Sequence, residues 1–147
     1  MLIGAESQKK LTQCRAAVFG VGGVGSYVAE ALARAGVGDI TLVDSDVVSL
    51  SNINRQLIAL HSTVGKYKTD VMKERILDIN PDARVTAVNV LYTPENADSL
   101  ALDGFDVVID CIDTVTSKLE LITRASNSKV KIFSSIDRKS TRLNSSH

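Results

Sequence analysis

The sequence has few cysteines and no long apolar run. Its 147 residues include two cysteines, Cys14 and Cys111, which lie far apart and indicate no disulfide framework. The longest apolar stretches have the length of a strand and are interrupted by charge, so we expect no membrane-spanning segment. Residues 1–10 have neither the long apolar region nor the cleavage-site pattern of a secretory signal. These absences predict a cytoplasmic protein without a membrane partner.

The sequence also lacks an excess of one charge, since 17 basic residues balance 17 acidic ones. Residues 137–147 read Asp-Arg-Lys-Ser-Thr-Arg-Leu-Asn-Ser-Ser-His and have no hydrophobic period. They look like a translated sequencing adapter, so we expect this tail to be foreign; the alternative is a genuine basic tail that binds RNA. Without the tail the chain is mildly acidic, and it has no basic stripe of the kind that identifies a nucleic-acid-binding face.

Predicted strands and helices alternate along the rest of the chain. Hydrophobic residues make up 44% of the sequence, which is enough for a substantial core. The pattern predicts an α/β fold with a doubly wound, mostly parallel Rossmann-like sheet and helices on both faces. We expect residues 1–136 to form one incomplete N-terminal domain, truncated at both ends. The predicted strands are 16–19, 40–43, 85–90, 105–110 and 130–133, and the predicted helices are 5–11, 24–35, 55–60, 69–80 and 117–126.

A glycine-rich turn lies between the first predicted strand and the first long helix. Gly20, Gly22 and Gly25 fit the pattern Gly-x-Gly-x-x-Gly, whose glycines allow a tight turn, close approach of a phosphate, and close helix–strand packing. The following helix presents free N–H groups and a positive dipole end to an anion. This motif alone does not specify a nucleotide. Asp44 lies at the spacing of a ribose-binding acid, so an NAD(P)-binding dehydrogenase domain remains an alternative.

Polar side chains follow the ends of several predicted strands. The carboxyl ends of parallel strands meet at one edge of a sheet, so these side chains should line one crevice. Cations there would balance phosphate charge, while paired carboxylates would hold a hard metal ion. This combination favours ATP with Mg²⁺ over a plain NAD site. The residues concerned are Asp44, Asp46, Asn52, Arg55, Gln56, Lys66, Lys68, Asp110 and Asp113.

These motifs resemble those of the ThiF-type adenylyltransferases, which are related to ubiquitin-activating enzymes. The resemblance covers about residues 2–133 and is most specific in the Asn-x-x-Arg-Gln element that follows Asp44-Ser45-Asp46. Within the superfamily, the finer features resemble the tRNA threonylcarbamoyladenosine dehydratases. Activators of sulfur-carrier proteins are the alternative: they usually have Leu where Ile53 stands, lack Asn54, and tend to read Asp-Asn where this chain has Asp113-Thr114. The matching segments are Gly20–Gly25, Asp44–Asp46, Ser51–Gln56, Val64–Lys68 and Asp110–Asp113.

The resemblance implies an activity and a role for each matching residue. ATP would adenylate the carboxylate of N6-threonylcarbamoyladenosine in tRNA, and ring closure would then release AMP, so that water is removed at the expense of ATP. The alternative substrate is the C-terminal Gly-Gly of a ubiquitin-like sulfur carrier. In either reaction the resemblance places Gly23 and its neighbours against the nucleotide, Asp44 on the ribose, Asn52, Arg55 and Lys68 on the phosphates, and Asp113 on magnesium.

The resemblance also implies partners. They are tRNA carrying threonylcarbamoyladenosine, a second copy of the chain in a homodimer and, as a further possibility, a cysteine-desulfurase-linked sulfur acceptor protein. Relatives carry an arginine, in a segment before Leu2, that reaches the neighbouring subunit's active site. We therefore expect the present chain to be inactive by itself. A non-catalytic interaction module is the remaining alternative, in which the Arg55, Lys68 and Asp113 cluster has no chemical role.

Several of these residues also have purely structural interpretations. Asp46 could equally cap the turn after its strand, and Gln56 could fix its loop through backbone hydrogen bonds. Asp110 could do no more than end a strand. Cys111 lies beside the predicted site, but no base accompanies it, so a packed thiol is favoured over a nucleophile.

Overall fold

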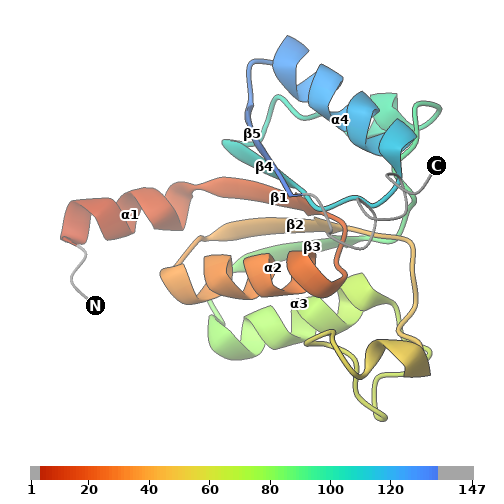
Figure 1. Cartoon of the computed structure of the whole chain (residues 1–147). Coiled ribbons are helices and arrows are strands. Elements are labelled where there is room, and N and C mark those ends of the chain that lie inside the picture. Colours follow the sequence, from red (N-terminus) through yellow and green to blue (C-terminus); the bar gives the residue numbers. More distant parts are fainter. Residues whose placement is uncertain (1–3, 136–147) are drawn as a thin grey trace.

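A five-stranded parallel sheet forms the centre of the computed structural model, which describes residues 4–135 (Figure 1). The proposed adapter tail, residues 137–147, lies outside the described residues. The sheet confirms the predicted α/β class, and all of its strand pairs are parallel. Its order is β3-β2-β1-β4-β5. The strands are β1 (Arg15–Phe19), β2 (Asp39–Val43), β3 (Arg84–Val88), β4 (Val107–Asp110) and β5 (Lys131–Ser134).

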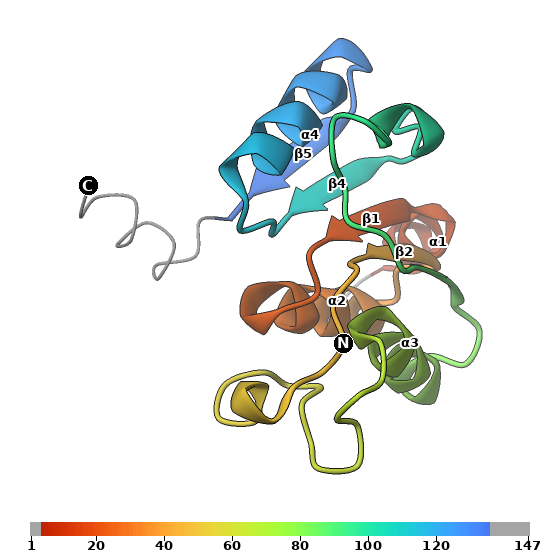
Figure 2. The same cartoon turned by 90° about the vertical axis from the view of Figure 1, so that its right-hand side faces the viewer.

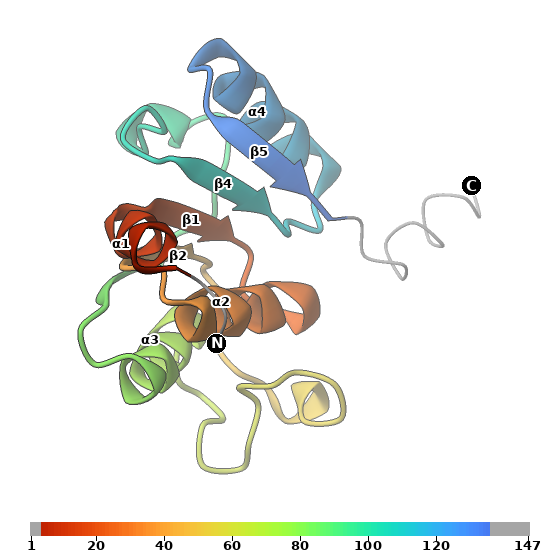
Figure 3. The ribbon, with the colours of Figure 1, turned by 90° about the vertical axis from the view of Figure 1, so that its left-hand side faces the viewer.

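Helices cover both faces of the sheet, as a doubly wound fold requires. In Figure 1 and Figure 3, α2 and α3 lie on one side of the sheet and α4 lies on the other. The first helix, α1, extends beyond the amino ends of the strands and has no buried residue. The helices are α1 (Ala5–Gln13), α2 (Gly23–Ala35), α3 (Lys68–Ile79) and α4 (Val115–Asn127), with short 3₁₀ turns η1 (Leu50–Asn52) and η2 (Ala97–Ser99).

The central strand β1 is buried on both faces because its side chains alternate between two apolar clusters. Ala16 and Val18 pack into the cluster beneath α2 and α3. Ala17 and Phe19 point the other way, into the cluster beneath α4 and η2. A continuous apolar run, rather than an alternating one, is what a two-sided parallel strand needs. This explains the run Ala16–Phe19.

The direction of winding reverses at β1. The chain adds β2 and then β3 on one side of β1, and it crosses back to add β4 and β5 on the other side. The loops after β1 and β4 therefore leave the sheet toward opposite faces, and this opens a crevice at the carboxyl ends of these strands. Figure 2 views the molecule from the side at which these strand ends lie.

Several local predictions were wrong. Residues 55–60 form turns instead of a short helix, and the one-turn helix η1 lies upstream of them. The reason is a capping box, in which the side chain of Asn52 accepts hydrogen bonds from the backbone N–H and the hydroxyl of Ser49, both at 2.9 Å. This arrangement starts the helical turn at Leu50, upstream of the predicted position.

The helical spacing of apolar residues predicts a buried face of α2 made of Val24, Val28, Ala31, Leu32 and Ala35, and this is right only in part. Val28 and Leu32 do pack against the core. Val24 and Ala31 are exposed, whereas Ala29 and Ala33 are fully or almost fully buried. Small residues one turn apart let the helix axis lie close to the sheet, and this close packing decided which face turned inward.

Candidate nucleotide-binding site

The glycine turn between β1 and α2 is built by close backbone contacts. Gly20 has φ +95°, and a Cβ there would lie 2.4 Å from the carbonyl oxygen of Cys111. A Cβ on Gly25 would lie 1.7 Å from the carbonyl oxygen of Gly20. Gly22 differs, because the nearest atom to its Cβ position is Nε2 of Gln56, at an ordinary 3.7 Å. Protein packing therefore requires glycine at Gly20 and Gly25, but not at Gly22.

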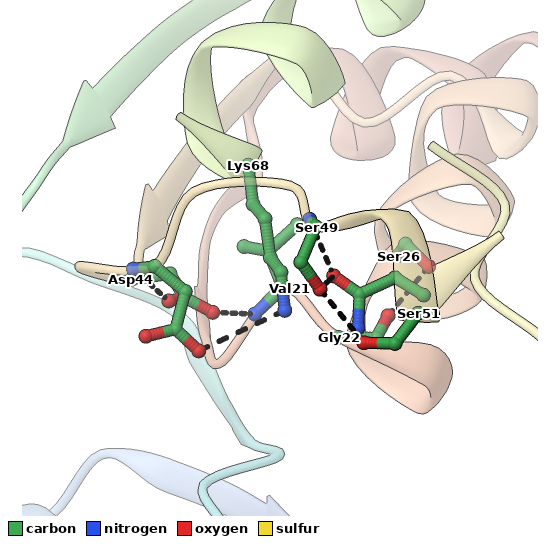
Figure 4. A network of polar contacts seen from close by, with 9 residues as sticks. Val21, Gly22, Ser26, Asp44, Ser49, Ser51 and Lys68 are labelled. Carbon is green, nitrogen blue, oxygen red and sulfur yellow. Dashed lines mark hydrogen bonds and ion pairs between the residues drawn. The ribbon is translucent and has the colours of Figure 1, made fainter. Parts of the chain in front are cut away.

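Asp44, at the end of β2, ties this turn to the loop that follows β2. One carboxylate oxygen accepts a hydrogen bond from the Val21 N–H at 2.7 Å, and the other accepts from the Asp46 N–H at 2.7 Å. Figure 4 shows Asp44 pointing toward Val21 across the gap between the two strand ends. Each carboxylate oxygen can accept a second hydrogen bond. Asp44 can therefore shape the loop and still bind a hydroxyl group.

Lys68 brings a cation to the same place from the start of α3. Its side chain is only 7% exposed, and its Nζ lies 3.7 Å from a carboxylate oxygen of Asp46, whose own side chain is 69% exposed. The backbone N–H of Lys68 also donates to the carbonyl of Asp46 at 3.0 Å. An ion pair with so exposed a partner contributes little stability. The ammonium group of Lys68 is therefore available to pair with an anionic ligand in place of Asp46.

Arg55 is exposed and is held by its own loop. Its Nη1 donates to the carbonyl of Ser51 at 3.0 Å and to the side-chain oxygen of Asn54 at 3.2 Å. Gln56 follows it and is buried, and its side-chain Oε1 has no hydrogen-bond partner among residues 4–135. A Gln56 that only fixed its loop would be expected to use this oxygen in a hydrogen bond to the loop, and it does not.

These groups line one pocket of about 600 Å³ at the carboxyl ends of the strands. A cavity of this size suits a ligand as large as a nucleotide. The pocket includes the residues predicted to line the crevice except Asn52, Lys66 and Asp110. Asn52 lies in the capping box of η1 and does not line it. The predicted residues that line the pocket are Gly20, Gly22, Gly23, Gly25, Asp44, Asp46, Arg55, Gln56, Lys68 and Asp113.

One apolar wall of the pocket was missed from the sequence. Val90, Leu91 and Tyr92 line it, together with Phe19. The sequence predicted strand as far as Val90, but β3 ends at Val88, and the freed residues turn into the pocket. Their position just after a parallel strand is the signal that could have identified them, because such strands end at the edge of the sheet where ligands bind.

Asp110, at the end of β4, has a structural role. It is fully buried and pairs with the ammonium group of Lys118 on α4 at 2.8 Å. It also accepts hydrogen bonds from Ser134 and from the Ile112 N–H, at 2.9 and 3.0 Å. Lys118 in turn donates to the carbonyl of Ser135 at 2.8 Å. The cluster joins β4, α4 and β5 and fixes the start of the loop that carries Asp113.

The sequence profile of the ThiF family matches residues 1–137, which is nearly the whole chain. The chain belongs to the ThiF family. This agrees with the resemblance drawn from the glycine turn and the Asn-x-x-Arg-Gln element.

Several named proteins are similar in sequence or structure to this ThiF-family domain. The tRNA threonylcarbamoyladenosine dehydratase of Bacillus subtilis strain 168 is 48% identical over 92% of this chain and 54% of its own length. The molybdopterin-synthase adenylyltransferase of Salmonella typhimurium strain LT2 is 36% identical over 88% of this chain and 51% of its own. The crystal structure of E. coli tRNA N6-threonylcarbamoyladenosine dehydratase in complex with ATP superposes with a TM-score of 0.87. It is 44% identical and covers 90% of this chain and 55% of that one.

This ThiF-family domain spans about half the length of the curated relatives that it matches. Within residues 4–135, no helix combines the length and the apolar character needed to cross a bilayer.

Cys111 lines the pocket of the ThiF-family domain, but its thiol is poorly suited to nucleophilic attack. Burial, with a smaller contribution from Asp110, raises its pKa to about 11. Only the thiolate reacts, so at pH 7.5 we expect iodoacetamide to alkylate Cys111 about two orders of magnitude more slowly in the folded chain than in the urea-unfolded chain. Peptide mass spectrometry after timed quenching measures both rates. Equal rates would contradict the packed-thiol interpretation.

Proposed function

We propose that the complete protein containing this domain is an enzyme that uses ATP to activate the carboxylate of N6-threonylcarbamoyladenosine in tRNA. Activation leads to cyclodehydration of that group. The observation that carries the proposal is the pocket, in which a glycine turn, a ribose-type carboxylate, two cations and Asp113 come together. The 48% and 44% identity to proteins named as dehydratases of this tRNA nucleoside supports the choice of substrate.

The triphosphate would lie between the amino end of α2 and the two cations. The helix starts at Gly23, and Gly22 before it makes no side-chain cap, so its first N–H groups are suited to bind an anion. Lys68 and Arg55 line the same pocket and would balance the remaining charge. Oε1 of Gln56, buried without a partner among the described residues, would accept a hydrogen bond from a donor group of the substrate. Asp44 would bind the ribose hydroxyls.

Asp113 would hold a magnesium ion against the phosphates. Magnesium is commonly bound by one or two carboxylates together with substrate phosphates, and it does not need a complete protein cage. Residues 4–135 contain no group of three or more potential metal ligands. With Asp113 as its protein ligand, this pocket therefore fits a phosphate-bound Mg²⁺ better than a resident metal centre. The bound ion would supply charge stabilisation at the pyrophosphate.

The proposed reaction makes one carboxylate oxygen into a leaving group. This oxygen attacks the α-phosphorus of ATP, the bond to the β-phosphate oxygen breaks, and pyrophosphate leaves with its electron pair. An internal nitrogen or oxygen of the substrate then attacks the activated carbonyl carbon and loses its proton. AMP departs with the original carboxylate oxygen. Arg55 and Lys68 would stabilise the negative charge that develops at the α-phosphate.

Activation of a sulfur-carrier protein is the second candidate, because the same adenylation pocket would serve it. One contact favours the dehydratase: Asn54, which carrier activators usually lack, accepts a hydrogen bond from Arg55 and so helps to orient the guanidinium. An NAD(P)-dependent reaction has less use for the two cations. A non-catalytic interaction module would not explain why the buried Lys68 lines the same pocket as the glycine turn.

The proposed partners follow from this function. A homodimer is supported by two apolar side chains one turn apart on α2, Val24 and Tyr27, which are 44% and 57% exposed. A cysteine-desulfurase-linked sulfur acceptor is a further proposed partner. We propose the cytoplasm as the compartment, since the substrate is tRNA.

The test is made on tRNA from a strain that lacks the complete gene. Nucleosides are digested and analysed by mass spectrometry under conditions that preserve the cyclic product. We expect the cyclic nucleoside to disappear and N6-threonylcarbamoyladenosine to accumulate. The intact gene should restore the cyclic form, whereas a gene encoding Arg55→Ala should not. Undiminished cyclic nucleoside in the deletion strain would contradict the proposed substrate.

A further inference from the structure

The apolar wall of the pocket is a segment without a strand partner. β3 ends at Val88, so Val90, Leu91 and Tyr92 line the pocket as irregular chain. Tyr92 is 3% exposed and packs its ring edge-on against Phe19, with ring centroids 5.0 Å apart. The Tyr92 hydroxyl is buried and has no hydrogen-bond partner within the described chain. Apolar packing within the cluster beneath α4 therefore holds this side chain, and the backbone on either side needs another restraint.

Asn96 supplies that restraint with both ends of its amide. Its Nδ2 donates to the carbonyl of Leu91 at 2.6 Å, and its Oδ1 accepts from the N–H of Thr93 at 2.9 Å. The two bonds fall on either side of Tyr92. Its backbone also caps η2, where the Asn96 carbonyl accepts from the N–H and the hydroxyl of Ser99. One side chain thus sets the path of the Leu91–Thr93 segment.

We infer that Asn96 is a positioning residue for the part of the pocket that holds the nucleobase. This inference rests on the proposed ATP-binding function. The charged groups Arg55 and Lys68 define the phosphate end of the pocket, and Asp44 suits the ribose. The apolar segment from Val90 to Tyr92 is then the surface left for a flat, weakly polar ring. Asn96 does not line the pocket, so it would act on the base only through this wall.

The experiment separates base binding from phosphate binding. AMP, ATP–Mg²⁺ and tripolyphosphate–Mg²⁺ are titrated by calorimetry into the 147-residue chain and its variants. In Asn96→Ala we expect the affinities for AMP and for ATP to fall by the same factor, about tenfold, because two hydrogen bonds that hold the base wall are lost. Tripolyphosphate has no base, and its affinity should not change.

Two further variants keep the test decisive. Asn96→Asp has the same shape and can still accept from Thr93, but it cannot donate to Leu91, so it should show a loss of AMP affinity even if the alanine variant unfolds. Ser99→Ala removes a hydrogen bond from the same turn without touching the wall, so all three affinities should match wild type. Circular dichroism checks that each variant is folded at the titration temperature.

The possible failures are distinguishable. Wild-type AMP affinity in a folded Asn96 variant, or an equal loss of tripolyphosphate affinity, would overturn the positioning role alone. If the wild-type chain bound neither AMP nor ATP, the nucleotide function and this inference would both be wrong.

Discussion

Alanine in place of Arg55 or Asp113 is expected to lower ATP–pyrophosphate exchange by the complete protein at least about a thousandfold. Both residues line the pocket beside the glycine turn. Arg55 is an exposed cation whose guanidinium is oriented by hydrogen bonds to Ser51 and Asn54. It can therefore contact the phosphate that is transferred. The measurement is incorporation of labelled pyrophosphate into ATP in the presence of the tRNA substrate.

Conservative and matched variants separate charge from geometry. Arg55→Lys keeps the charge but loses the planar fork of donors, so we expect only partial recovery. Asp113→Asn keeps the shape but loses the charge needed to hold magnesium, and it should remain inactive. Lys66→Ala is the control, because Lys66 is exposed and lies outside the pocket lining. It should exchange at the wild-type rate. Normal exchange by Arg55→Ala or Asp113→Ala would refute the assigned roles.

Gly25→Ala is expected to destabilise the fold by about 3 kcal/mol. The added methyl group would lie 1.7 Å from the carbonyl oxygen of Gly20, and this neighbour is backbone that cannot rotate away. The carbonyl of Cys111, just after β4, leaves no room beside Gly20, so a shift of Gly20 would disturb the end of β4 as well. For a chain of this size the change should lower Tm by about 10 °C. Calorimetry or circular dichroism during thermal unfolding measures it.

The matched control for this substitution is Gly23→Ala. Gly23 lies two residues earlier in the same helix, and nothing lies within 4 Å of the position its Cβ would take. Alanine favours a helix more than glycine does, so we expect Tm to stay unchanged or to rise slightly. If both variants unfolded at the same temperature, close helix–strand packing would not be the reason for glycine at Gly25.

Much of the candidate site was predictable because it is encoded locally. The glycine turn and Asp44 follow a strand directly, Asp113 lies in the loop just after β4, and in a parallel sheet all strands end at the same edge. Knowing the order of the strands is therefore enough to predict that these residues lie close together. Asn52 and Lys68 lie on the long connection between β2 and α3, whose path the sequence pattern does not give. There the prediction placed both residues on the phosphates, and the structure brings only Lys68 to the pocket.

The amino-acid sequence by itself determined the alternation of strands and helices, the turn at Gly20 and the family, because these depend on period, spacing and local backbone freedom. The tertiary structure alone decided which face of α2 is buried, that Asp110 pairs with Lys118, and that Val90 to Tyr92 form the apolar wall held by Asn96. The physical reason is that these outcomes depend on contacts between segments far apart in the chain. The residues next to a position in the sequence do not indicate which distant segment it will contact in the folded chain.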